Sequence, residues 1–137
     1  SGGFDPLHVG HLMCIQETVS LAKNNNGKVV IIVNGDQFLI NKKGKPFMPA
    51  AERCAIISAL KGVDMVIEWY DGSQTVAKAL ELFRPHFFTK GGDRSSPESV
   101  PEWSTCRKIG CEILFGIGGE KIQSSSALVK NSLKNND

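Results

Sequence analysis

Residues 2 to 12 read Gly2-Gly3-Phe4-Asp5-Pro6-Leu7-His8-Val9-Gly10-His11-Leu12. This stretch places a glycine pair, a proline and two histidines directly before a run with one apolar face, which is made by Leu12, Ile15, Val19 and Ala22. Apolar residues at this spacing indicate an amphipathic helix. Both imidazoles therefore lie in the first turn of the predicted helix.

The N-terminus of a helix favours bound anions, because its first backbone N–H groups have no partner within the helix and the helix dipole is positive there. His8 and His11 add side-chain donors on the same face of the predicted helix. Gly3 and Gly10 carry no Cβ, which lets a ligand approach the backbone closely. The stretch thus predicts a site for a polyphosphate.

Two other interpretations of the histidines account for less of the sequence. The first is an ordinary helix start with two surface or half-buried histidines, which leaves the glycines and the later motifs unexplained. The second is a metal site with His8, His11 and Cys14 as ligands. Residues at positions i, i+3 and i+6 do not converge on one point of a helix, and no fourth ligand is evident. We therefore expect no metal bound directly by the protein.

The composition is that of an ordinary globular domain, with 137 residues, of which 41% are hydrophobic and 22% are charged. A chain of this size can bury a core without cross-links, so we expect a single domain over 1–137 with a polar tail at 133–137. The net charge of +2 gives no support for a nucleic-acid partner. No apolar run approaches the roughly 18 residues of a membrane-spanning helix, so we expect no membrane partner.

The cysteines show neither a C-x-x-C pair nor a regular spacing; they are Cys14, Cys54, Cys106 and Cys111. Cys14 and Cys54 lie within amphipathic patterns, where cysteine behaves as a small apolar residue. Reduced core thiols of this kind are typical of a cytoplasmic protein, which is the predicted location.

Strand and helix patterns alternate along the rest of the chain. Residues 28–34 form an unbroken run without polar alternation, which indicates a strand buried on both faces of a parallel sheet. Further strands are predicted at 64–67, 86–89 and 111–115, and helices at 50–60, 74–83, 101–109 and 124–133. This order predicts an α/β fold: a doubly wound, Rossmann-like parallel sheet of about five strands, with helices on both faces.

Polar motifs follow the predicted strands or begin the predicted helices: Lys42 to Lys45, Glu52-Arg53, Lys90-Gly91-Gly92-Asp93 and Ser124-Ser125-Ser126. In a doubly wound sheet such positions meet beyond the carboxyl ends of the strands, where ligands bind. Lysines in a loop can hold phosphates as point charges, and an arginine can clamp a phosphate or form a surface salt bridge. Serines at a helix start can bind phosphates or simply cap the helix.

Together these motifs resemble the H-x-G-H nucleotidyltransferases, and within them the cytidylyltransferase-like family, in family order and over nearly the whole chain. That family includes glycerol-3-phosphate cytidylyltransferase and the adenylyltransferase domain that makes ADP-heptose. The resemblance implies transfer of a nucleotidyl group from ATP or CTP to a phosphate monoester, such as a sugar or polyol phosphate, with release of pyrophosphate. It also implies Mg²⁺ bound through the nucleotide phosphates, and dimerisation is common in the family.

The resemblance assigns roles to individual residues. His8, His11 and Lys42 are the expected catalytic residues, and Lys42, Arg53 and Lys90 are expected to bind the substrate phosphate. The nucleotide is expected to contact a larger set, namely Gly3, Phe4, His8, Gly10, His11, Lys45, Gly92, Asp93, Ser124, Ser125 and Ser126. Lys43 is expected to face solvent.

Several alternatives stay open at the level of sequence. The Lys90 to Asp93 string is close to that of the ADP-heptose-forming domain and favours ATP, but cytidylyl transfer to a polyol or amino-alcohol phosphate fits almost as well. A module that binds a nucleotide without chemistry is the competing class. The family also has a central strand immediately before the glycine pair, so we expect that the natural protein has further residues ahead of Ser1.

Overall fold

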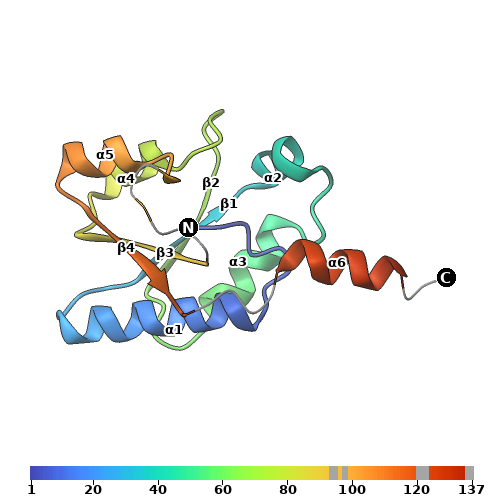
Figure 1. Cartoon of the computed structure of the whole chain (residues 1–137), viewed down its shortest axis with the longest axis horizontal. Helices are drawn as coiled ribbons and strands as arrows, with labels where there is room; N and C mark the ends of the chain where they lie inside the picture. The colour runs from blue at the N-terminus through green and yellow to red at the C-terminus, as the bar shows by residue number, and fades with distance from the viewer. Residues whose placement is uncertain (93–95, 97–98, 120–123, 135–137) are drawn as a thin grey trace.

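The computed structural model describes residues 1–92, 96, 99–119 and 124–134 (Figure 1). Helices and strands alternate over most of the chain, as the sequence predicts. The elements are α1 (Val9–Asn24), β1 (Val30–Asn34), α2 (Asp36–Lys43), α3 (Ala50–Ser58), β2 (Met65–Trp69), α4 (Ala77–Phe83), β3 (Phe87–Gly91), α5 (Trp103–Ile109), β4 (Glu112–Ile117) and α6 (Ser125–Lys134). Over this described part of the chain, no helix combines the length and apolarity needed to cross a bilayer.

Helix α2 was not predicted, because its residues were expected to belong to a loop. Its buried face is short, consisting of Phe38 and Leu39, and is too brief to give a helical period. The helix ends at Gly44, whose φ of 95° is a conformation that favours glycine. Lys42 and Lys43 therefore lie in the last turn of a helix, and only Lys45 lies in the loop that follows it.

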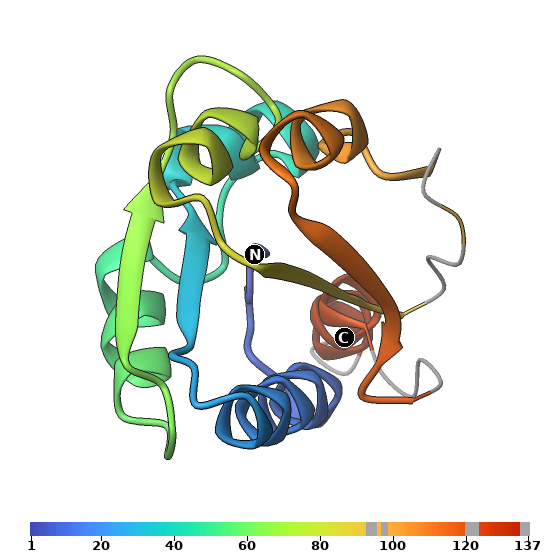
Figure 2. The same cartoon turned by 90° about the vertical axis from the view of Figure 1, so that its left-hand side faces the viewer.

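The strands form two parallel pairs, β1 with β2 and β3 with β4. The described residues thus contain four strands in two sheets, against the one sheet of about five strands that the sequence predicted. The start of the chain lies between the two pairs in Figure 2. Gly2 forms a parallel bridge there with Val33, donating to Ile32 O at 3.0 Å and accepting from Asn34 N at 2.9 Å. This single bridge does not join the β1–β2 pair to the β3–β4 pair in one continuous sheet.

Helices cover both faces of the sheets, which confirms the doubly wound arrangement (Figure 2). The side chains of β1 alternate: Ile31 and Val33 pack in one core cluster with α1 and α3, whereas Ile32 packs in the other with α4 and α5. Both clusters contain residues that are almost fully buried, such as Ile57 in the first and Leu80 in the second. The strand is therefore apolar on both faces, as its unbroken apolar run indicated.

The carboxyl ends of β3 and β4 lie close to the first turns of α1. Gly118, directly after β4, has a φ of 88°, and a Cβ there would lie 2.8 Å from Cys14 N. A Cβ on Gly91, at the end of β3, would lie 3.0 Å from Ile117 O and 3.2 Å from Cys14 Sγ. Thr18 of α1 also contacts Thr89 of β3, with 3.0 Å between the hydroxyl oxygens. These close approaches bring the ends of two strands to the first turns of α1.

Candidate active site

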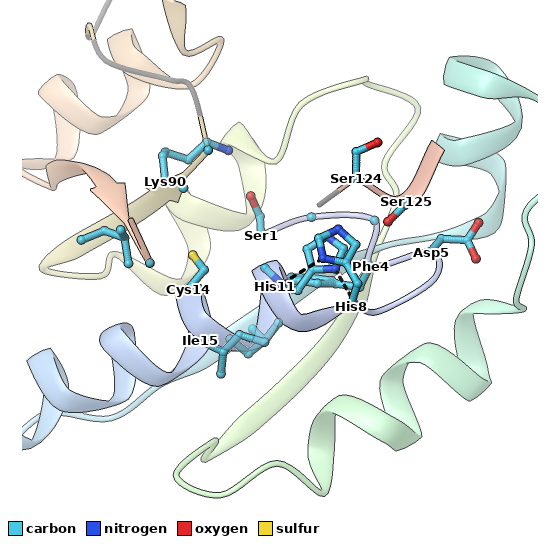
Figure 3. Close-up of a pocket in the computed structure, with 18 of the residues that line it drawn as sticks. Ser1, Phe4, Asp5, His8, His11, Cys14, Ile15, Lys90, Ser124 and Ser125 are labelled. Carbon is cyan, nitrogen blue, oxygen red and sulfur yellow. Dashed lines mark hydrogen bonds between the residues drawn. The ribbon is translucent and has the colours of Figure 1, made fainter. Parts of the chain in front are cut away.

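A cavity of about 640 Å³ lies at this junction, and Figure 3 shows the side chains around it. Most of the residues that the sequence singled out line it: Gly3, Phe4, His8, Gly10, His11, Lys42, Lys90, Gly92, Ser124, Ser125 and Ser126. They come from the start of the chain, α1, α2, β3 and α6, so the fold gathers segments that are far apart in the sequence. Asp93 lies outside the described residues.

His8 and His11 are locked together by the start of α1. His8 is the N-cap residue, and its Nδ1 accepts a hydrogen bond from Gly10 N at 3.1 Å. His11 Nδ1 accepts in turn from His8 N at 3.2 Å, which completes a capping box. The two rings are stacked, with 3.8 Å between their centroids and an interplanar angle of 23°. The pair is therefore held rigidly before any ligand binds.

The backbone hydrogen bonds also fix where each ring carries its proton. Because Nδ1 accepts an N–H in both residues, a neutral ring must be protonated at Nε2. Burial, together with the smaller effects of the charges on His8 and Lys43, lowers the pKa of His11 from 6.5 to about 4. His11 is thus a neutral hydrogen-bond donor at neutral pH.

The lowered pKa of His11 predicts a specific pH dependence of stability. Between pH 6.5 and 4 the unfolded chain protonates this imidazole while the folded chain does not, so its contribution to the free energy of unfolding falls as the pH falls. His11→Gln removes this contribution and keeps a favoured residue at the third helix position. In urea unfolding at pH 7 and pH 5, we expect the variant to lose less stability than the wild type. Equal losses would contradict the buried neutral imidazole.

The Phe4 ring packs against His11 of the histidine pair. Its ring is almost fully buried and meets His11 edge to face, with 5.1 Å between centroids and an interplanar angle of 65°. Its backbone is left-handed, with φ at 53°, a region that a bulky residue occupies only when its surroundings hold it there. The chain thus turns sharply at Phe4 and brings the His11 ring against the Phe4 ring.

Lys43 is exposed, as predicted, but it also lines the cavity. Its Nζ lies 3.3 Å from Asp5 Oδ2 and donates to Asp5 O at 3.0 Å. Asp5 is 1% exposed, and its carboxylate also accepts from Phe47 N at 2.8 Å and Met48 N at 2.7 Å. The place of Asp5 and Lys43 at the site was not predicted from the sequence. The orientation of the Lys43 side chain depends on α2, a helix that the sequence did not indicate. The only available signal was an aspartate within the glycine-histidine stretch.

Lys42 lines the cavity with Lys43, whereas Lys45 does not. Lys45 lies beyond the end of α2 and lines a neighbouring groove instead. The predicted contact between Lys45 and the nucleotide is therefore not supported by its position. The three lysines of this segment divide between two hollows because Gly44 turns the chain between them.

Arg53 is buried away from the cavity, and the structure contradicts its predicted contact with a substrate phosphate. The residue is 1% exposed. Its guanidinium donates to Gly3 O at 2.8 Å, Asn34 O at 2.6 Å, Met48 O at 2.9 Å and Asp36 Oδ1 at 2.8 Å. These bonds use four of the five N–H donors of an arginine. Arg53 therefore holds the start of the chain against β1 and α3, where it positions the site without reaching a ligand.

Lys90 and the serines at the start of α6 also line the cavity. Lys90 Nζ lies 4.9 Å from the centroid of the Phe88 ring, a cation–π distance. Ser124 Oγ accepts from Ala127 N at 3.0 Å, as a cap of α6 does. Ser125 Oγ donates to Pro6 O at 2.8 Å and so ties the start of α6 to the glycine-histidine stretch (Figure 3). Part of the serine motif thus has a structural use.

The cavity is electropositive, because Lys42, Lys43 and Lys90 line it and Asp5 is the only acidic residue among the described lining residues. A sequence profile of the family described as Cytidylyltransferase-like matches residues 1–129 of this chain. The chain belongs to the cytidylyltransferase-like family. This confirms the family predicted from the sequence, and with it a domain of the nucleotidyltransferase type.

Individual relatives agree with that assignment. The chain is 32% identical over 122 residues to the bifunctional protein HldE of Hahella chejuensis, covering 88% of this chain but only 22% of HldE. It is 30% identical over 113 residues to the FAD synthase of Methanopyrus kandleri, covering 82% of this chain and 73% of that protein. A crystal structure of the lipopolysaccharide core biosynthesis protein from Thermoplasma volcanium GSS1 superposes with a TM-score of 0.66 at 27% identity, covering 90% and 93% of the two chains.

Proposed function

We propose that this domain transfers a nucleotidyl group from a nucleoside triphosphate to a phosphate monoester and releases pyrophosphate. The observation that carries the proposal is the stacked pair of His8 and His11 at the start of α1, facing a cavity that is rich in lysine. A neutral imidazole donor beside ammonium groups suits the oxygens of a polyphosphate.

In the proposed reaction, an oxygen of the acceptor phosphate attacks the α-phosphorus of the nucleotide. A new P–O bond forms, and the bond from the α-phosphorus to the oxygen shared with the β-phosphate breaks, so that pyrophosphate leaves with the electron pair. Charge grows on the non-bridging and leaving oxygens. His8 and His11 stabilise this charge by donating hydrogen bonds from Nε2. Lys42 and Lys43 hold the acceptor phosphate next to the phosphates of the nucleotide. No side chain has to act as a nucleophile or a base.

The donor set of the cavity fits Mg²⁺ held by the nucleotide rather than by the protein. Asp5 is the one carboxylate among the described lining residues, and both of its oxygens already accept backbone N–H groups. Mg²⁺ commonly keeps several waters and binds through substrate phosphates. When bound in this way, it neutralises charge on the phosphate oxygens.

ATP is the first candidate donor, and a sugar or polyol phosphate is the acceptor that the resemblance implies. The FAD synthase relative makes, by its name, a dinucleotide with an adenylate half, which supports ATP. The resemblance of Lys90 to Asp93 to the ADP-heptose-forming domain points the same way. CTP with a polyol or amino-alcohol phosphate remains the alternative. A binding module without chemistry would bind the nucleotide and release no pyrophosphate.

Nucleotide binding can be tested by thermal unfolding with ATP, CTP, GTP and UTP, each with Mg²⁺. A nucleotide at 100 times its dissociation constant adds about 2.7 kcal/mol to the free energy of unfolding. We expect ATP to raise the midpoint most. Selective stabilisation by CTP would replace ATP as the donor and keep the reaction, whereas no stabilisation by any of the four would contradict a nucleotide site.

A further inference from the structure

A second hollow of about 540 Å³ adjoins the active-site cavity and plays no part in the proposed nucleotide site. It is lined by the segment that connects α2 to α3 and by residues of α6, the helix at the right of Figure 1. Lys43 and Ser126 line both hollows. The groove formed by this second hollow therefore opens directly onto the place where the phosphate groups are expected to meet.

The charges of the groove favour an anion. Lys43, Lys45 and Lys130 line it, and no acidic side chain does among the described residues. Lys43 is partly neutralised by Asp5 at 3.3 Å. Within the part of the chain that the structure describes, neither Lys45 nor Lys130 forms an ion pair. The ammonium groups of Lys45 and Lys130 line the groove and not the cavity.

The wall of the groove is apolar. Phe47 is 60% exposed and Leu133 is 67% exposed, and both line the hollow together with Val129 and Pro46. An exposed phenylalanine beside exposed aliphatic side chains offers a face on which a ring or hydrocarbon body can stack. Among the described lining residues, Ser126 is the only one with a hydroxyl, and none carries an amide or carboxylate side chain. Such a wall is poorly suited to the many hydroxyls of a sugar.

We propose that this groove holds the acceptor, and that the acceptor is a phosphate monoester of an alcohol with an aromatic or apolar body. This inference rests on the proposed function. The phosphate of the acceptor lies at Lys43, beside His11, and its body extends along Phe47 towards Leu133. It replaces the sugar or polyol as the acceptor class, because the apolar wall stabilises a ring more than it stabilises hydroxyl groups.

The test compares 1-naphthyl phosphate with glycerol 3-phosphate and glucose 1-phosphate. Binding is followed by naphthyl fluorescence and by calorimetry, and turnover is followed by pyrophosphate release with saturating nucleotide and Mg²⁺. We expect 1-naphthyl phosphate to bind at least about tenfold more tightly than the other two, which corresponds to about 1.4 kcal/mol. Binding is measured independently of turnover, so a failure of the proposed reaction is separable from a failure of the groove.

Variants of the apolar wall make the assignment specific. Phe47→Ala and Leu133→Ala are each expected to weaken the binding of 1-naphthyl phosphate about tenfold. Neither variant should change the thermal shift that ATP produces. The backbone of Phe47 stays anchored to Asp5 through its N–H at 2.8 Å, so truncation of the exposed side chain leaves the fold intact. Leu82→Ala is the matched control, because Leu82 is 70% exposed on α4 and lines neither hollow.

Lys130→Gln tests the charge of the groove, with Lys78→Gln on α4 as its control. We expect Lys130→Gln to weaken the binding of all three phosphate monoesters and Lys78→Gln to leave their binding unchanged. Tighter binding of glucose 1-phosphate or glycerol 3-phosphate, unaffected by Phe47→Ala, would overturn the groove assignment while the proposed reaction stands. A dimer that Phe47→Ala dissociates, with acceptor binding unchanged, would also overturn it, because the groove would then be a contact between two copies of the chain.

Discussion

Replacing His11 by alanine lowers the turnover number by a factor on the order of 10²–10³, while the fold survives. The loss is large because the imidazole is preorganised: its Nδ1 is held by His8 N at 3.2 Å, and its ring is packed against His8 and Phe4. The donated hydrogen bond strengthens as charge grows on the phosphate oxygens, so its removal affects the transition state more than the bound nucleotide. Steady-state pyrophosphate release at saturating nucleotide and acceptor measures the effect.

His86→Ala is the control for this experiment. His86 is the remaining histidine of the chain, is exposed, and lies just before β3 without lining the cavity. We expect it to keep full turnover. The thermal midpoint of His11→Ala should fall by only about 2–7 °C, since the lost capping bond contributes about 0.5–2 kcal/mol. Near-full turnover of His11→Ala would remove this residue from the mechanism.

Replacing Arg53 by lysine destabilises the fold, although the charge is retained. The guanidinium forms four hydrogen bonds from a buried position, three of them to backbone carbonyls of separate segments. Lysine has three donors in a different geometry and leaves buried acceptors without a partner. We expect the free energy of unfolding to fall by about 3 kcal/mol, within the range for breaking a buried charged network. The thermal midpoint then drops by about 10 °C.

Arg107→Lys provides the comparison for this prediction. Arg107 is exposed on α5 and lies over the Trp103 ring at 5.0 Å, a contact that lysine can also make, so its midpoint should change little. A phosphate clamp predicts the opposite pattern for Arg53→Lys, namely an unchanged midpoint with a raised KM for the acceptor. That outcome would restore the role that the sequence first suggested and contradict the structural role.

Local patterns in the sequence predicted much of the fold and part of the candidate site. The glycine-histidine stretch predicted the start of α1 and the two imidazoles, and the apolar run at 28–34 predicted a strand buried on both faces. Both features depend on neighbouring residues along one segment, where hydrophobic period and capping chemistry are visible. The capping box between His8 and His11 follows from the same three-residue spacing that marked the pair.

The parts that the sequence did not predict depend on contacts between distant segments. Arg53 carries the same charge whether it faces a phosphate or the carbonyls of Gly3 and Asn34, and only the packing of α3 against the chain start decides between them. Lys43 and Lys45 are separated by one glycine, yet the end of α2 directs them to different hollows. The groove beside Phe47 is lined by residues of α6 and of a segment about eighty residues earlier in the chain, so no local pattern could predict it.

Pyrophosphate release with both substrates present is the most direct measurement of nucleotidyl transfer by this domain. The protein is incubated with ATP or CTP, Mg²⁺ and a phosphate monoester, and reactions without the acceptor serve as blanks. We expect release that requires nucleotide and acceptor together, with one coupled nucleotidyl product formed for each pyrophosphate. Tight nucleotide binding without release, across sugar, polyol, amino-alcohol and aromatic phosphates, would contradict it and identify the domain as a nucleotide-binding module.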